Sequence, residues 1–209
     1  MKRRHILIGG AAALLLPAAL GPAWRARPAR AQEIEVRDDD RVLGPADAPI
    51  TIVEYSSLTC PHCARLHETA LQQIKSDWVE PGKARLVYRH FPLDGLALRA
   101  AALANCVEGE RFFAFLDLLF KSQERWAKSN DPLRQLGQLG RLAGLGQERI
   151  DACLQDQAEM EAILRQRRTG EQTYDINSTP TLVINGEVHP GALDYAAYQE
   201  IFERVAPGT

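Results

Sequence analysis

The sequence is poor in cysteine and has no long apolar run. Four cysteines in 209 residues exclude a small fold held together by many disulfides. The most apolar stretch, Ile6 to Leu20, covers about 15 residues and contains Gly9, Gly10 and Pro17, whereas a membrane-spanning helix needs about 20. Neither charge dominates, since 25 Lys and Arg stand against 27 Asp and Glu, and this balance gives no reason to expect nucleic-acid binding.

The N-terminus has the pattern of a signal peptide over residues 1–31. A basic start, Met1 to Arg4, precedes the apolar run, and Ala29-Arg30-Ala31 offers a small-x-small cleavage site. Arg3-Arg4 resembles a twin-arginine export signal, although Lys2 and Ile6 depart from the usual pattern, so general secretion also remains open. An uncleaved membrane anchor is the alternative interpretation.

Cleavage would leave one acidic domain at 32–209. It would remove six basic residues and no acidic one, so that 19 Lys and Arg would face 27 Asp and Glu, a net charge of −8. The remaining length is enough for a single domain with a substantial core. The acidic run Asp38-Asp39-Asp40 is expected to be a solvated segment before the first strand.

Cys60-Pro61-His62-Cys63 is the segment that carries chemistry. If a helix begins near Cys60, the two sulfurs lie one turn apart and can open and close a disulfide. A Cys60 thiolate would then be stabilised by the helix N-terminus and by the imidazole of His62. A stabilised thiolate favours the reduced form, so the motif predicts an oxidant that gives its disulfide to another protein.

A metal site is the alternative for this motif. Zinc needs four ligands, and Cys106 and Cys153 are distant and do not form a second C-x-x-C pair. His62 and His67 could complete a ligand set on paper. We predict no metal, and a copper- or zinc-handling module remains a rival interpretation.

The patterns around the motif predict an α/β sheet. A β-branched run at 50–55 leads into the motif, an apolar helical pattern follows, and 85–91 is a second strand. The order strand, helix, strand favours a parallel pair. Residues 181–184 and 187–189 around Asn185-Gly186 predict a hairpin, followed by a helix at about 194–205. The apolar helical face after the motif is expected at Ala64, Leu66, Ala70, Leu71, Ile74 and Trp78, with its end at Pro81-Gly82.

These features together resemble the thioredoxin fold and, within it, the DsbA family of bacterial periplasmic disulfide oxidants. The shared elements are C-P-H-C after a strand that bears Glu54, Thr179-Pro180 before the third strand, and the final hairpin and helix. The resemblance implies an α/β thioredoxin-like fold with an inserted all-helical subdomain, which the long helical stretch at about 97–173 would form.

The resemblance also implies roles for individual residues. Cys60 would be the exposed nucleophile that forms a mixed disulfide, and Cys63 the more buried sulfur that resolves it. Pro180 would be a cis-proline facing the motif, with the backbone of Thr179 pairing with the substrate. Glu54 would be a partly buried acid that assists proton transfer; a trans proline and an exposed glutamate are the structural alternatives.

Family membership would further imply partners and a compartment. The clients would be reduced, unfolded proteins newly exported to the periplasm, and a DsbB-type membrane partner linked to quinones would reoxidise the protein. No small cofactor is implied, because the electrons travel on the redox-active disulfide.

The insertion contains the other two cysteines, Cys106 and Cys153. Four cysteines allow a second disulfide, and we predict that these two are bonded, with two buried free thiols as the alternative. Such a bond would remove on the order of 4 kcal/mol of unfolded-chain entropy.

Two further rivals remain for the function. A periplasmic disulfide reductase or isomerase would use the same cysteines, but isomerases of this fold carry an N-terminal dimerisation domain, for which 32–49 is too short. We therefore expect a monomer. A thiol transferase for glutathione conjugates would need a glutathione pocket, for which no residues can be named.

Overall fold

The computed structural model describes residues 34–109 and 111–206, all within the unit that spans residues 31–209. The predicted signal peptide at 1–31 lies outside the described residues. Within the described part of the chain, no helix is both long enough and apolar enough to cross a membrane.

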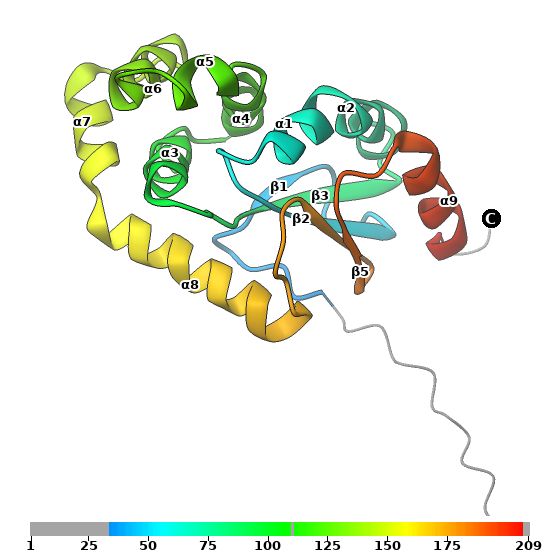
Figure 1. Ribbon diagram of the computed structural model, residues 1–209. Coiled ribbons are helices and arrows are strands. Elements are labelled where there is room, and N and C mark those ends of the chain that lie inside the picture. The colour runs from blue at the N-terminus through cyan, green and yellow to red at the C-terminus, as the bar shows by residue number, and fades with distance from the viewer. Residues whose placement is uncertain (1–33, 110, 207–209) are drawn as a thin grey trace, which may run out of the picture. The chain divides into compact units, whose positions relative to one another are not determined.

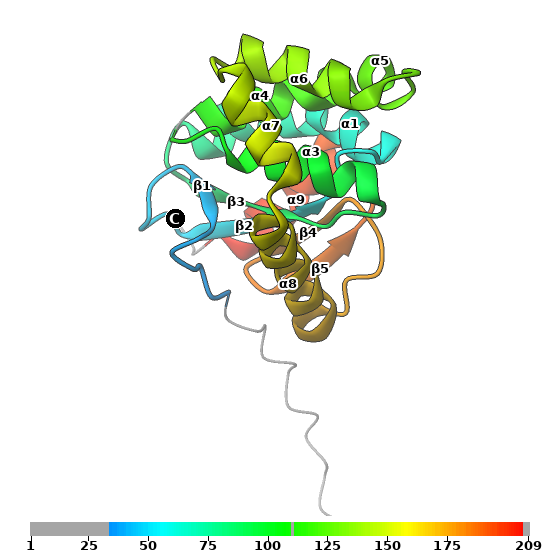
Figure 2. The same cartoon turned by 90° about the vertical axis from the view of Figure 1, so that its left-hand side faces the viewer.

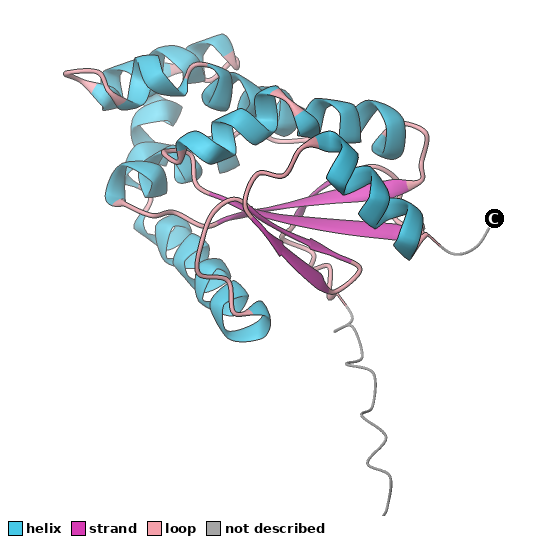
Figure 3. Ribbon diagram, turned by 45° about the vertical axis from the view of Figure 1, so that its right-hand side comes forward, coloured by secondary structure: helices cyan, strands magenta, loops and turns pink. Residues whose placement is uncertain are grey.

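The centre of the unit is a five-stranded mixed sheet (Figure 3). The strands lie side by side in the order β1-β3-β2-β4-β5, with β2 parallel to β3 and the other neighbours antiparallel. The parallel pair and the C-terminal hairpin confirm the sequence prediction. The bounds are β1 Arg41–Leu43, β2 Ile50–Ser56, β3 Ala84–His90, β4 Thr181–Ile184 and β5 Glu187–Pro190.

Both faces of the sheet are covered, so β2 is buried along its whole length. Ile52 packs in one apolar cluster and Val53 in another, as the two-residue alternation of a strand requires. Figure 1 shows α8 (Gln157–Tyr174) on one side of the sheet, with α1 (Pro61–Glu68), α2 (Ala70–Ile74) and α9 (Tyr195–Val205) on the other. Gly170 of α8 approaches closely: an added Cβ would lie 2.6 Å from the Cε1 atom of Tyr55.

The helix after the motif is not continuous, contrary to the prediction. It breaks at Thr69, whose φ of −123° and ψ of −100° are not helical, and it resumes as α2 and a π-helical turn, η1 (Lys75–Val79). The Thr69 hydroxyl donates to the carbonyl of Arg65 at 2.7 Å, a local bond that competes with the helical ladder. The apolar face survives the break, since Leu66, Leu71 and Ile74 are all buried.

A helical insertion lies between β3 and β4, as the prediction required (Figure 2). It starts at Gly95 and ends at Tyr174, within two residues of the predicted bounds. Three of its helices begin at an aspartate whose carboxylate accepts a backbone N–H: Asp94 for α3, Asp131 for α6 and Asp156 for α8. The helices are α3 Gly95–Asn105, α4 Arg111–Lys121, α5 Gln123–Ala127, α6 Pro132–Leu142, α7 Gln147–Gln155 and α8.

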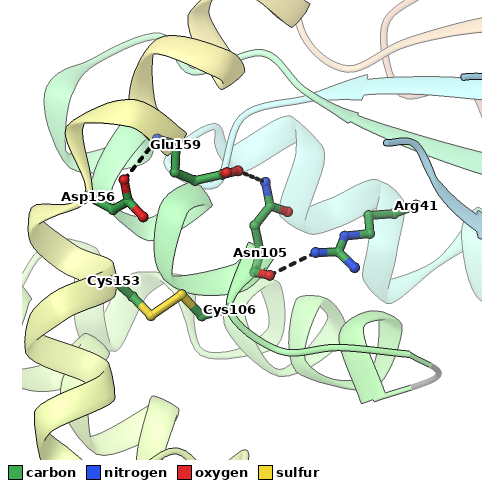
Figure 4. Close-up of a disulfide and its surroundings, with 6 residues drawn as sticks. All are labelled: Arg41, Asn105, Cys106, Cys153, Asp156 and Glu159. Carbon is green, nitrogen blue, oxygen red and sulfur yellow. Dashed lines mark hydrogen bonds between the residues drawn. A yellow bond between two sulfur atoms is a disulfide. The ribbon is translucent and has the colours of Figure 1, made fainter. Parts of the chain in front are cut away.

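A disulfide joins Cys106, directly after α3, to Cys153 in α7 (Figure 4). The two Cα atoms are 6.3 Å apart. Beside it, the Asn105 amide donates to Glu159 at 2.6 Å, and the Asn105 carbonyl accepts from Arg41 at 2.7 Å. The disulfide and these bonds tie the insertion to itself and to the edge of the sheet.

The acidic run before β1 is solvated only in part, which corrects the prediction for Asp40. Its carboxylate is fully buried and accepts two hydrogen bonds from Arg89, at 2.9 and 2.7 Å. Arg89 also donates to the Tyr55 hydroxyl at 3.0 Å. The partner of Asp40 lies 49 residues away, so local sequence context could not reveal it. Asp39 is exposed, as expected.

Candidate active site

The C-P-H-C motif sits where β2 gives way to α1. Cys60 is the N-cap residue, Pro61 opens the helix, and the backbone N–H groups of Cys63 and Ala64 donate to the Cys60 carbonyl at 3.1 and 3.2 Å. Proline suits this position because its fixed φ matches a helix and no N–H is needed there. The Cys60 sulfur therefore lies at the positive end of α1.

Both motif cysteines are free thiols, and they differ in exposure. Cys63 is completely buried, whereas 6% of Cys60 is accessible. Cys60 is less open than the predicted exposed nucleophile, but it is the one of the two that solvent reaches. The order of exposure is the order that the sequence predicts.

The environment of Cys60 favours its thiolate. A hydrogen bond from the Cys63 thiol is the largest influence and, against the opposing effect of burial, lowers the pKa of Cys60 to about 5. The Thr179 side chain and the backbone N–H groups of Cys63 and His62 lower it further. His62 thus acts through its backbone, while its side chain is exposed.

The environment of Cys63 has the opposite effect. Burial raises the pKa of the Cys63 thiol well above its usual value, and the adjacent Cys60 sulfur raises it further. The Ser56 side chain and the backbone of Ser57 lower the pKa of Cys63 and oppose this rise only in part. One sulfur of the pair is therefore set to be a thiolate and the other to keep its proton.

The segment Thr179-Pro180 reaches the motif through Thr179. The peptide bond between them is cis, and the Cys60 thiol donates to the Thr179 carbonyl at 3.3 Å. Among the described residues, the buried Thr179 hydroxyl has no hydrogen-bond partner. The segment before β4 thus closes one side of the site, 119 residues away in sequence.

Glu54 lies beneath the motif and is fully rather than partly buried. Its Oε1 accepts a hydrogen bond from the Ser56 hydroxyl and lies 2.9 Å from Nε2 of His67. Across the sheet it is in register with Tyr88 on β3 and Leu182 on β4. No described residue is hydrogen-bonded to its Oε2 or to the buried Tyr88 hydroxyl.

Three residues at the site were not identified as such from the sequence. Ser56 and His67 are the partners of Glu54, and Gln123 of α5 donates to the carbonyls of Leu58 and Cys60 at 2.9 and 3.0 Å. The spacing of His67, four residues after Cys63 on the same helix face, could have indicated that its side chain lies near the motif. Gln123 offered none, because it reaches the motif from the insertion.

His67 uses both ring nitrogens, Nε2 toward Glu54 and Nδ1 toward Asp117, so it does not turn toward the motif cysteines as a ligand would. Across 34–109 and 111–206, no three His, Cys, Asp or Glu side chains are grouped so that they could hold a metal ion. What the arrangement can do chemically is exchange a disulfide through Cys60 and Cys63.

A family model described as thioredoxin matches residues 37–204. The crystal structure of alpha-DsbA1 from Wolbachia pipientis superimposes with a TM-score of 0.77 and 28% identity, covering 82% of this chain and 92% of that one. The chain belongs to the DsbA-like disulfide oxidoreductases of the thioredoxin fold.

Curated relatives of this DsbA-like chain carry names of the same kind. A Rickettsia bellii protein, provisionally named a protein-disulfide oxidoreductase, is 31% identical over 179 residues, which cover 81% of this chain and 69% of that protein. Disulfide bond formation protein D of Bacillus subtilis is 26% identical over 178 residues, covering 80% and 77%. For a similarly named Rickettsia felis protein, this DsbA-like chain spans only 55% of the length.

Proposed function

We propose that this protein is a disulfide donor that oxidises pairs of thiols in newly exported proteins. One observation carries the direction of transfer: the pKa of Cys60 is lowered to about 5 while that of Cys63 is raised. A thiolate stable at neutral pH favours the reduced form of the enzyme, and it makes the Cys60–Cys63 disulfide a strong oxidant.

The reaction has two steps. A substrate thiolate attacks the Cys60 sulfur, the Cys60–Cys63 bond breaks, and the electron pair leaves on Cys63, which takes up a proton. A second substrate thiolate then attacks the substrate sulfur of the mixed disulfide, and Cys60 leaves as a thiolate. The substrate dithiol has lost two electrons and two protons, and the enzyme has gained the two electrons and one proton.

The geometry supports this assignment of roles. Cys60 is the accessible sulfur and has the lower pKa, so it suits both attack by a substrate and departure as a thiolate. The backbone of Thr179 lies beside it, where an extended substrate segment could pair. A cavity of about 410 Å³, lined in part by Pro61, Leu96 and Gln123, flanks the motif on the side of the insertion.

The wider setting belongs to the same proposal. We place the mature protein in the periplasm as a monomer, with a membrane partner of the DsbB type to restore its disulfide. Its clients are reduced, unfolded chains rather than folded proteins, because attack on Cys60 requires a thiol that can approach a sulfur that is 6% exposed.

The decisive measurement is the reduction potential of the Cys60–Cys63 pair in glutathione buffers. A potential near about −120 mV supports the donor, whereas one near about −270 mV would make the protein a reductant and overturn the proposal. The Cys106→Ser/Cys153→Ser double variant reports the motif alone and is the control. Oxidation of a reduced peptide by stoichiometric enzyme, followed by mass spectrometry, tests the same direction kinetically.

A further inference from the structure

A continuous series of buried polar side chains leads from Cys63 toward the surface. We call it the buried relay; its members, from inside to outside, are Ser56, Glu54, His67 and Asp117. They come from β2, α1 and α4. Because three elements must come together to make it, the series is a product of the tertiary fold.

The inner end of the buried relay touches the reacting sulfur. The Ser56 side chain acts on Cys63 and lowers the pKa of its thiol, while the Ser56 hydroxyl donates to Oε1 of Glu54. All three residues are fully buried. A proton that moves between Cys63 and solvent must therefore pass the Ser56 hydroxyl and the Glu54 carboxylate.

His67 is the middle of the buried relay. Its Nε2 lies 2.9 Å from Oε1 of Glu54, and its Nδ1 lies 3.0 Å from Oδ1 of Asp117. The ring is stacked on Phe120 with the centroids 4.0 Å apart, which holds it in the plane between the two carboxylates. An imidazole bonded on both sides can accept a proton at one nitrogen and release one at the other.

The outer end reaches solvent at Asp117, whose side chain is 33% exposed. Lys75 of η1 donates to both of its carboxylate oxygens, at 2.8 and 2.7 Å. A cavity of about 520 Å³ lies here, lined by His67, Asp117, Glu68, Gln72 and Lys121. Solvent can thus exchange protons with the outer end while Cys63 stays enclosed.

The charged groups around His67 counteract the effect of burial on its pKa. Glu54 faces it from β2 and Asp117 from α4, the Tyr88 ring on β3 lies 6.2 Å away, and Lys75 acts on it through Asp117. Burial alone would lower the pKa of His67, but the two carboxylates outweigh burial and raise it. This setting favours the protonated imidazole.

Disulfide exchange needs such a path because Cys63 must gain a proton when the disulfide opens and lose it when the disulfide forms again. Its sulfur is completely buried, so no water reaches it directly. The family resemblance already assigns proton transfer to Glu54. We propose that His67 and Asp117 complete its path, so that the buried relay carries the proton between the Cys63 sulfur and solvent. The proposal rests on the exchange chemistry proposed above.

Each group in the buried relay that gives up a proton receives another in its place. When Cys63 leaves as a thiolate, the Ser56 hydroxyl gives it a proton and takes one from Glu54. Glu54 has received that proton from Nε2 of His67, and Nδ1 regains one from solvent by way of Asp117. When Cys63 attacks a mixed disulfide at Cys60, the same proton returns in the opposite direction. His67 does not touch a reacting sulfur, so it acts through Glu54.

The test isolates the step in which Cys63 loses its proton. One equivalent of Ellman's reagent, added to the protein with Cys60 and Cys63 reduced, releases a first thionitrobenzoate when Cys60 attacks. It releases a second when Cys63 attacks the mixed disulfide. The second phase is followed by stopped flow from pH 5 to 9. The bonded pair Cys106–Cys153 does not react with the reagent.

His67→Gln is the main variant and His90→Gln its matched control. His90 is also a buried histidine. It lies next to Ser56 in the strand register, but its ring is hydrogen-bonded to Asn105 and to no member of the buried relay. Burial lowers the pKa of His90 to about 4, so it stays neutral over the range measured. Positioned acids and bases contribute factors of about 100 or more, and we expect His67→Gln to slow the second phase at least tenfold at pH 7.

In the same experiment the first phase of His67→Gln should stay within about twofold of wild type, and both phases of His90→Gln should be unchanged. The slowed phase should also lose its pH dependence near neutrality. Equal slowing of both phases, equal slowing in His90→Gln, or a wild-type second phase would overturn the buried relay. If His67→Gln does not fold, Asp117→Asn decides by the same criteria.

The outcome is independent of the direction of electron flow. The second phase is intramolecular and proceeds whether the protein works as an oxidant or as a reductant. A potential near that of a reductant would therefore overturn the proposed function and leave the buried relay standing. An unchanged second phase in His67→Gln would overturn the buried relay and leave the proposed function standing.

Discussion

The two cysteine pairs of this protein differ in their separation along the chain, their redox state and their surroundings. Cys60 and Cys63 are three residues apart at the start of α1 and are free thiols, whereas Cys106 and Cys153 are 47 residues apart and bonded. The first pair lies among groups that act on the charge of a thiolate: backbone N–H groups at a helix N-terminus and the side chains of Ser56 and Thr179. The second pair joins two helices of the insertion.

The reactivity of a cysteine in this protein therefore depends on the groups that surround it. A bond that links distant segments gains stability from the constraint on the unfolded chain. A bond between neighbours in sequence gains little in this way, so hydrogen bonds and charge can determine its redox behaviour.

The largest expected effect is on activity and separates the two pairs directly. Cys60→Ser should reduce oxidation of a dithiol peptide by at least about 1,000-fold, because it removes the sulfur that forms the mixed disulfide. The Cys106→Ser/Cys153→Ser variant should stay within about twofold of wild type in the same assay. A comparable loss in both variants would contradict the division.

The second largest effect concerns the stability of the fold and involves the Cys106–Cys153 pair. Removing the Cys106–Cys153 bond should lower the free energy of unfolding by about 4 kcal/mol, from the entropy of a loop closed over 47 residues. That is on the order of 10 °C in Tm for a domain of this size. Thermal unfolding followed by circular dichroism measures the shift. A destabilisation below about 1 kcal/mol would show that the bond does not constrain the unfolded chain.

A third effect concerns pH and arises only at the motif. The pKa of Cys60 is lowered in the folded reduced protein to about 5, from an ordinary value of 9.0. A lowered pKa stabilises the reduced form fully above the unfolded value, and this stability is lost as the pH falls through about 5. The Tm of the reduced form, measured relative to that of the oxidised form, should therefore fall from pH 8 to pH 4.

The same ionisation should appear in the reduction potential. Above pH 5, reduction takes up two electrons and one proton, so the potential should change by about 30 mV per pH unit. Below pH 5 both sulfurs are protonated and the slope should double to about 59 mV. A slope of about 59 mV up to pH 8 would mean that Cys60 is an ordinary thiol.

The smallest effect should come from Thr179→Val. Its hydroxyl is buried and lowers the pKa of Cys60. Valine keeps the shape and removes that influence, so the pKa of Cys60 should rise, which alkylation by iodoacetamide across pH 4 to 9 would measure. Thr181→Val is the matched control, because that hydroxyl donates to the Ser178 carbonyl instead. An unchanged pKa in Thr179→Val would show that the backbone alone sets it at this side of the site.

Much of the fold was predictable because its signals are local. The strands at Ile50–Ser56 and Ala84–His90 are rich in β-branched, aromatic and other apolar residues. The Asn185-Gly186 turn has the positive φ angles, 46° and 90°, that those residues favour. The break at Thr69 was missed because the apolar pattern continues across it. Asp40 was misplaced because its partner, Arg89, is remote in sequence.

By itself, the sequence determined the reactive pair, the strands on either side of it and the segment Thr179-Pro180, because each is encoded in a few adjacent residues. Only the tertiary structure decided that Cys63 has no access to solvent, that Glu54 is fully buried, and that His67 links it to Asp117. The physical reason is that a pKa depends on burial and on groups within a few ångströms, and those groups come from elements that are far apart along the chain.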